Sequence, residues 1–288
     1  MVARKLLKGL LVGCTGFLLL SCSDDEPPKV AEHKAATVGQ PSAQAAGMAQ
    51  AVAHNMAGKS GFSKSQEKAI AELVRKTLLE RPEILQEAFA ALEKRDKERE
   101  AKSKQEALAS SADMLFRSKL SPVAGDPRGD VTVVEFFDYN CPYCRKAFHD
   151  LDAVMKDDPK LRVVFKEYPI FGGASLIAAK AALAARKQGK YFEFHSAILR
   201  AEGRATRESV FRTAKKLGLD IARLKKDMNS PEVRQSIAET RRLASRLGIH
   251  GTPAFYVGDK YIGGAPRNLV DLMKNYAKDI RQNGCKHC

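Results

Sequence analysis

Hydrophobic and polar positions divide the 288-residue chain into zones. Residues 1–21 are largely apolar after a basic start, and residues 22–61 hold few large apolar side chains. Residues 62–118 place apolar side chains at helical spacing, interrupted by a nearly all-charged stretch. Residues 119–284 alternate short apolar, β-branched runs with helical patterns, which predicts an α/β domain. Residues 285–288 form a separate tail that begins and ends with cysteine.

Within the α/β domain, the apolar runs at residues 131–137 and 161–169 predict buried strands. Most of the stretch between the second run and residue 248 has helical periodicity, at Leu176–Lys187, Tyr191–Leu199, Val210–Leu217, Ile221–Met228 and Val233–Leu247. A hairpin over residues 259–265 and a helix from Arg267 to about Arg281 are predicted to complete the domain.

The tetrapeptide Cys141-Pro142-Tyr143-Cys144 lies between the first strand and a helical pattern. Unpaired amides and the helix dipole at a helix N-terminus stabilise a thiolate, and proline suits the first helical turn. A CxxC pair can also be half of a zinc site, with residues 285–288 as the other half. The strand-to-helix context favours a redox pair, in which Cys141 is the exposed nucleophile and Cys144 the buried resolving thiol.

A second motif, Gly251-Thr252-Pro253, leads into the apolar run 254–257. Alone, it would indicate a trans proline that opens an ordinary strand. Together with the CxxC pair, it resembles the thioredoxin superfamily. That resemblance implies a cis Thr252–Pro253 bond facing the cysteines, with Thr252 and Pro253 holding an extended substrate.

The helical stretch between the second strand and this turn resembles the DsbA family of bacterial disulfide oxidoreductases, over about residues 131–281. The resemblance implies a thioredoxin fold with a helical insertion at about 172–248, preceded by an α-helical N-terminal segment. It implies thiol–disulfide exchange without a cofactor. It also implies that Glu135 is a buried acid that moves the proton of Cys144, although a simple pairing of Glu135 with Lys166 is equally open.

Two positions depart from DsbA. Tyr143 stands where DsbA has histidine, and Thr252 stands where it has valine. A phenol cannot stabilise a thiolate as a histidinium does, so we expect Cys141 to be less activated and its disulfide to be a weaker oxidant. Threonine before the proline is a feature of the isomerases DsbC and DsbG, and DsbG has a CPYC pair. Pro142 and Tyr143 are expected to contact substrate, and oxidation and isomerisation both stay open.

Residues 62–104 carry apolar stripes that need a partner surface, formed by Ile70, Leu73, Val74, Leu78, Leu85, Phe89 and Leu92. The arrangement resembles the N-terminal oligomerisation segment of ScsC-type proteins, which implies a homodimer or homotrimer. A solvated helical spacer is the alternative. The charged run 93–104 breaks any heptad pattern, so a long coiled coil is not expected.

Residues 1–21 have the form of a signal peptide, because a basic start precedes an apolar run too short for a comfortable membrane span. The sequence Leu19-Leu20-Ser21-Cys22 resembles a bacterial lipobox, which implies a lipid anchor on Cys22; ordinary cleavage nearby is the alternative. Ser23 then favours the outer membrane, with the protein in the periplasm. Residues 22–61 are expected to be a flexible linker.

Six cysteines occur in the chain. If Cys14 leaves with the signal and Cys22 is acylated, two CxxC pairs remain, which suits an oxidising compartment. For Cys285 and Cys288, an accessory disulfide or a metal-reactive tail is favoured over a second catalytic centre, in a chain end expected to be disordered.

The sequence therefore predicts an exported oxidoreductase that forms or isomerises disulfides in unfolded or misoxidised exported proteins. A membrane partner of DsbB or DsbD type is expected to recycle it. The net charge of +15 permits attraction to anionic lipids or acidic partners. Nucleic acid is not expected, because the basic residues are dispersed among acids. The alternatives are a protein that sequesters copper or zinc through its CxxC pairs and, less favoured, a structural surface lipoprotein.

Overall fold

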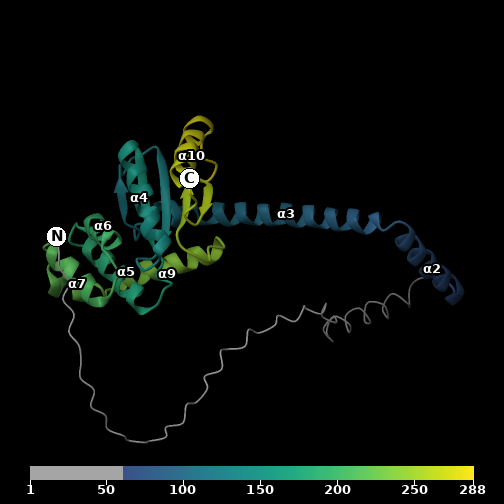
Figure 1. Ribbon diagram of the computed structural model, residues 1–288, viewed down its shortest axis with the longest axis horizontal. Helices are drawn as coiled ribbons and strands as arrows, with labels where there is room; N and C mark the ends of the chain where they lie inside the picture. Colours follow the sequence, from purple (N-terminus) through teal and green to yellow (C-terminus); the bar gives the residue numbers. More distant parts are fainter. Residues whose placement is uncertain (1–60) are drawn as a thin grey trace, which may run out of the picture. The chain divides into compact units, whose positions relative to one another are not determined.

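The computed structural model describes residues 61–288 (Figure 1). The predicted signal peptide, the lipidated Cys22 and nearly all of the linker lie outside the described residues. The chain divides into two units at Glu80 and Arg81, and each unit is considered by itself. Among the described residues, no helix has the length and apolar character that a membrane span requires.

The first unit contributes helix α2, Lys64–Glu80. Ser63 caps it reciprocally: its hydroxyl accepts from the Gln66 amide at 3.4 Å, and the Gln66 side chain accepts from the Ser63 amide at 2.8 Å. The helix buries none of its residues. Most of its large apolar side chains, including Leu73 and Val74, are exposed.

The second unit begins with helix α3, Glu83–Ala112, which continues into a π-helical turn, η1, at Asp113–Arg117. The predicted helical segment is therefore interrupted at Arg81-Pro82. The charged part of α3 is exposed and carries ion pairs one turn apart, such as Lys97–Glu93 at 2.7 Å. The end of the segment is buried, with Leu108, Ala112, Leu115 and Phe116 in the core of this unit.

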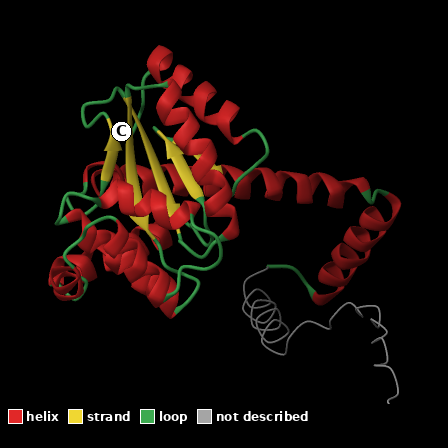
Figure 2. Ribbon diagram, turned by 60° about the vertical axis from the view of Figure 1, so that its left-hand side comes forward, coloured by secondary structure: helices red, strands yellow, loops and turns green. Residues whose placement is uncertain are grey.

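A five-stranded sheet in the described residues has the order β1-β3-β2-β4-β5. The strands are β1 Val123–Gly125, β2 Val131–Phe137, β3 Leu161–Glu167, β4 Ala254–Val257 and β5 Lys260–Gly263 (Figure 2). Strands β2 and β3 run parallel, whereas β4 runs antiparallel to β2. The short edge strand β1 was not predicted, because three residues are too few for a periodicity.

Both faces of the sheet are covered by helices. Val133 and Phe137 belong to one core with α4 (Pro142–Asp157), α6 (Tyr191–Arg200) and α10 (Leu269–Asn283). Val134 and Phe136 point to the other face, where they pack with α9 (Pro231–Arg246), η1 and the end of α3. Alternation along β2 thus separates the two cores.

Between β3 and β4 the chain is helical, as predicted: α5 Gly173–Arg186, then α6, α7 Arg207–Lys216, α8 Ile221–Asp227 and α9. Side-chain caps start the later helices, for example Asp220, which accepts from the Arg223 amide at 3.0 Å. Gly218 and Gly248, at φ +68° and +66°, lie just past the ends of α7 and α9.

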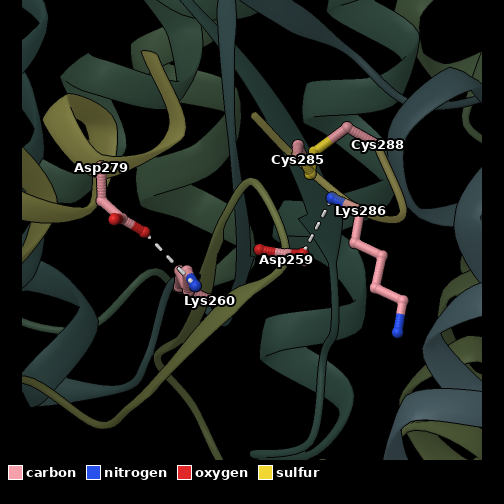
Figure 3. The surroundings of a disulfide bond; sticks show 6 residues. All are labelled: Asp259, Lys260, Asp279, Cys285, Lys286 and Cys288. Atoms are coloured by element: carbon pink, nitrogen blue, oxygen red, sulfur yellow. Dashed lines mark hydrogen bonds and ion pairs between the residues drawn. A yellow bond between two sulfur atoms is a disulfide. The ribbon is translucent and has the colours of Figure 1, made fainter. Parts of the chain in front are cut away.

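The expectation of a disordered C-terminal tail is wrong. Cys285 and Cys288 are joined by a disulfide, and the Lys286 amide donates to Asp259 at 3.1 Å (Figure 3). The tail can pack closely because Gly258, in the turn between β4 and β5, has no side chain. A Cβ there would lie 3.3 Å from the Cys288 sulfur and 2.7 Å from the nearest atom of Ile280.

Candidate active site

The two cysteines lie where β2 gives way to α4. Cys141 is the N-cap of α4 in an extended conformation, and Pro142 and Cys144 both lie in the first turn of the helix. Amides of Tyr143 and Cys144 are directed at the Cys141 sulfur and stabilise its thiolate. This is the strand-to-helix placement that the sequence predicts.

The Thr252–Pro253 peptide bond is cis, which confirms the prediction from the resemblance. The Thr252 carbonyl lies 3.2 Å from the Cys141 sulfur, although the two residues are 111 positions apart. The antiparallel pairing of β2 and β4 explains this approach, because Phe136 lies opposite Ala254. The segment that follows Phe136 and the segment that precedes Ala254 therefore meet at the same end of the two strands.

The prediction that Cys141 is exposed is wrong: 1% of its surface is accessible, and Cys144 is fully buried, as expected. The Thr252 carbonyl and the first turn of α4 cover the Cys141 sulfur, a long-range contact that local sequence does not reveal. The side chain exposed beside it is Tyr143, at 65%. Both cysteines are free thiols.

The pKa values of the two thiols move in opposite directions. Hydrogen bonding from the Cys144 thiol, and then from nearby donors including the α4 amides, lowers the pKa of Cys141 to about 6. Burial, followed by its hydrogen bond with Cys141 and the neighbouring charges, raises the pKa of Cys144. At neutral pH the outer sulfur is therefore a thiolate and the inner one a protonated thiol, which suits a nucleophile backed by a resolving thiol.

Glu135 is fully buried, and neither oxygen of its carboxyl group has a hydrogen-bond partner among residues 61–288. Burial, and then the negative charge of Cys141, raise the pKa of Glu135 to about 8. Its alternative pairing with Lys166 is wrong. Lys166 is opposite Phe136 in the β2–β3 register, so it points to the other face of the sheet, where it donates to Ser121 at 2.7 Å.

The segment just before Cys141 is a feature that sequence reasoning missed. The Asp138 carboxylate accepts from the Ile170 and Phe171 amides at 2.8 and 2.9 Å. The Asn140 side chain accepts from the Ala205 amide at 2.8 Å and donates to its carbonyl at 3.2 Å. These bonds fasten residues 138–140 to the loop after β3 and to the helical insertion, and nothing in the local pattern around Asn140 indicates them.

A buried polar cluster extends this connection. The hydroxyls of Tyr139 and Tyr191 donate to Glu167 at 3.0 and 2.9 Å, and Tyr139 also lies 3.1 Å from Nδ1 of His195. Burial raises the pKa of Glu167 well above its usual range and lowers the pKa of His195 to about 3. His195 is therefore neutral at pH 7, and burial disfavours the charged form of Glu167. The sequence signal that could have identified Glu167 is an acidic residue within an otherwise apolar predicted strand.

The tail disulfide is remote from Cys141 and Cys144. It contacts the turn after β4, whereas Pro253 precedes β4, so the two are separated by the strand, about 13 Å at 3.3 Å per residue. A zinc site built from both CxxC pairs is therefore not formed. Within residues 61–288, no group of three or more His, Cys, Asp or Glu side chains is placed to hold a metal ion.

Comparison with known protein families agrees with this geometry. A model described as a DSBA-like thioredoxin domain matches residues 132–276, about half of the chain. A second, described as the copper resistance protein ScsC N-terminal domain, matches residues 66–99. The chain belongs to the DsbA-like thioredoxin family, whose membership implies thiol–disulfide oxidoreductase activity.

Two solved structures and one curated protein show how similar the chain is to known proteins. A thioredoxin-like oxidoreductase from Silicibacter pomeroyi is 45% identical, with a TM-score of 0.57, over 59% of this chain and 97% of that one. A linker-deleted ScsC mutant from Proteus mirabilis is 27% identical, with a TM-score of 0.57, over 78% and 99%. A Na(+)/H(+) antiporter NhaA 3 from Salinispora tropica is 30% identical over 152 residues, 52% of this chain. The chain spans about a quarter of that antiporter's length, 23%.

We predict that alkylation of Cys141 in the reduced protein follows a titration with a midpoint near pH 6, because only the thiolate reacts. Iodoacetamide labelling mapped by peptide mass spectrometry measures it. Cys144 should remain unlabelled, and the denatured chain, with ordinary thiols near pH 8.5, is the control. A native midpoint at 8 or above would contradict the prediction.

Proposed function

We propose that this protein is an exported oxidoreductase that forms or isomerises disulfides in extracytoplasmic proteins through Cys141 and Cys144. The observation that carries the proposal is the arrangement of one sulfur at a helix N-terminus, 3.2 Å from the carbonyl before a cis proline, with a second thiol buried behind it. Family membership supports the chemistry, and the CPYC pair and the threonine support an isomerase-like site.

As an oxidase, the Cys141–Cys144 disulfide is attacked at Cys141 by a substrate thiolate. A mixed disulfide forms, and Cys144 leaves as a thiolate that takes up a proton. A second substrate thiolate then attacks the substrate sulfur, which forms the substrate disulfide and releases the Cys141 thiolate. Two electrons pass from substrate to protein. As an isomerase, the Cys141 thiolate attacks a wrong disulfide, and a later substrate thiolate releases it unchanged.

Backbone contacts at Thr252 and Pro253 would hold the substrate as an extended segment beside the sulfur. Pro142 and the exposed Tyr143 would contact the same segment. A membrane partner of DsbB or DsbD type would recycle the cysteine pair.

Lipidation of Cys22 would hold the protein at the periplasmic side of the outer membrane. Fatty-acid labelling of the wild type, compared with Cys22→Ser, tests this. The solved structure of a periplasmic thioredoxin-like protein from Salmonella enterica is 28% identical to the chain, which supports this location.

Substitution of Cys141 tests the activity. We expect Cys141→Ala to abolish insulin reduction and the refolding of scrambled ribonuclease, because no nucleophile remains. Cys144→Ala should instead accumulate mixed disulfides, visible on non-reducing gels, because the resolving thiol is missing. Cys285→Ala/Cys288→Ala is the matched control and should retain both activities. Full activity of Cys141→Ala, with stoichiometric copper or zinc bound by the wild type, would support metal sequestration instead.

Glu135 is proposed to move the proton of Cys144. Burial places its pKa at about 8, so it holds a proton near neutral pH and can exchange it with a leaving thiolate. We expect Glu135→Gln to slow release of the mixed disulfide by at least about tenfold between pH 7 and 9. It should also remove the rate change near pH 8. Stopped-flow kinetics measures both, and a preserved pH profile would rule out the proton role.

Self-association through residues 62–104 is the second part of the proposal. Most apolar side chains of α2 and of the first turns of α3 are exposed, Leu73 at 64% and Phe89 at 68%, and the ScsC N-terminal model matches residues 66–99, most of α2 and the first half of α3. A dimer or trimer would bury these stripes. It would also place several redox sites around one substrate, as an isomerase requires.

We expect Leu73→Lys/Phe89→Lys to lower the sedimentation mass to that of a monomer, because charge opposes burial of the stripe. Ser65→Lys/Gln86→Lys adds the same charge at polar positions and should keep the wild-type mass. A monomeric wild type, or an unchanged mass in the first variant, would disprove association through these helices.

A further inference from the structure

A hollow of about 330 Å³ lies between α5 and α9. Its cations are Lys180 from α5 and Arg234, Arg241 and Arg242 from α9. Its apolar lining includes Leu176 and Ile237, which pack together in a small core between these two helices. Because Ile237 is buried and the three arginines are exposed, the hollow is cationic at its rim and apolar at its floor.

The positive charge of this hollow is not balanced within the described part of the chain. None of its four cations forms an ion pair there. The acids of α9 are engaged elsewhere: Glu232 pairs with Lys187 at 3.1 Å, and Glu239 accepts a hydrogen bond from the Ser118 hydroxyl. Like charges held close together raise the local potential, and an anionic ligand would lower it.

The lining indicates which kind of anion fits. Arginine side chains bind carboxylates through paired hydrogen bonds, and three of the four cations are arginines. The apolar floor would remain unused by a simple anion, but it suits an aliphatic or aromatic side chain flanked by acidic residues. A polypeptide segment that combines both features matches the hollow better than a lipid headgroup does.

Both walls of the hollow connect to the redox site. On α5, Ser175 precedes Leu176 and accepts from the side chain of Asn140, the residue before Cys141, at 3.1 Å. On the other wall, α9 ends at Arg246 and leads within six residues to Thr252, whose carbonyl contacts Cys141. The first turn of α5, which carries Leu176, therefore lies next to the residue that precedes Cys141.

We propose that this hollow is a substrate-selecting site, which binds an acidic segment of the polypeptide whose cysteine reacts at Cys141. The inference rests on the proposed function and adds the substrate class: chains with acidic residues around an apolar one, near the reacting cysteine. Because the cations are at the surface, the attraction is screened by salt and changes substrate preference more than the chemical step.

The test uses the full-length oxidised protein and two dithiol peptides that differ only in four positions, Glu in one and Gln in the other, around a leucine. We expect kcat/KM to favour the acidic peptide by about tenfold at low salt, and the ratio to fall towards one at high salt. Arg241→Gln/Arg242→Gln should bring the ratio close to one and leave the neutral peptide's rate unchanged. Lys215→Gln/Lys216→Gln on α7, which removes two exposed cations elsewhere, should keep the wild-type ratio.

An unchanged ratio in the arginine variant, or an equal loss in both double variants, would overturn the proposal. So would loss of phosphatidylglycerol vesicle binding in the arginine variant with the peptide ratio preserved, since the hollow would then serve a membrane. If neither peptide is oxidised, the oxidase activity in the proposed function fails. Fluorescence anisotropy of the same peptides on Cys141→Ala/Cys144→Ala then tests the hollow separately: tighter binding of the acidic peptide supports it, and equal binding overturns it.

Discussion

Antiparallel pairing between β2 and β4 brings the cysteines and the cis proline together. Phe136 lies opposite Ala254, and the chain continues from one to Cys141 and from the other back to Thr252. The sulfur is therefore covered on one side by the Thr252 carbonyl at 3.2 Å and on the other by the first turn of α4. A shift of one residue in this pairing would turn alternate side chains to the wrong face and separate the two motifs.

Side chains behind the sulfur make this arrangement rigid. Asp138, Tyr139 and Asn140 are consecutive and buried, and each bonds to a different part of the chain. A typical hydrogen bond contributes only about 1 kcal/mol to folding. We therefore infer that these bonds fix the position of Cys141 more than they stabilise the whole fold. Glu135 differs from them, because its carboxyl group is buried and has no hydrogen-bond partner within the described part of the chain. Such a group costs free energy, and its retention beside two cysteines is consistent with a role in proton transfer.

Different elements carry the different proposed tasks. Redox chemistry belongs to the end of β2 and the start of α4, selection of substrates to the surface of α5 and α9, and self-association to α2 and the early turns of α3. The thiolate is stabilised by hydrogen bonds from Cys144 and the helix amides, in the absence of a histidine at position 143. Stabilising the thiolate stabilises the reduced protein, and this makes the disulfide a better oxidant.

Much of this fold can be predicted from local sequence patterns. Periodicity, caps and turn chemistry act over a few residues and can be recognised in the sequence. They predict the bounds of β2, the helices from α5 to α9, the glycines that follow α7 and α9, and the CPYC pair before a helix. Tertiary structure alone decided the rest. The β2–β3 register directs Lys166 away from Glu135, the β2–β4 pairing buries Cys141, and Gly258 admits the C-terminal tail. Asn140 meets Ala205 only after the helical insertion has folded back. These contacts join residues far apart in sequence, and their free energies depend on which surfaces meet, a property that no short window of sequence contains.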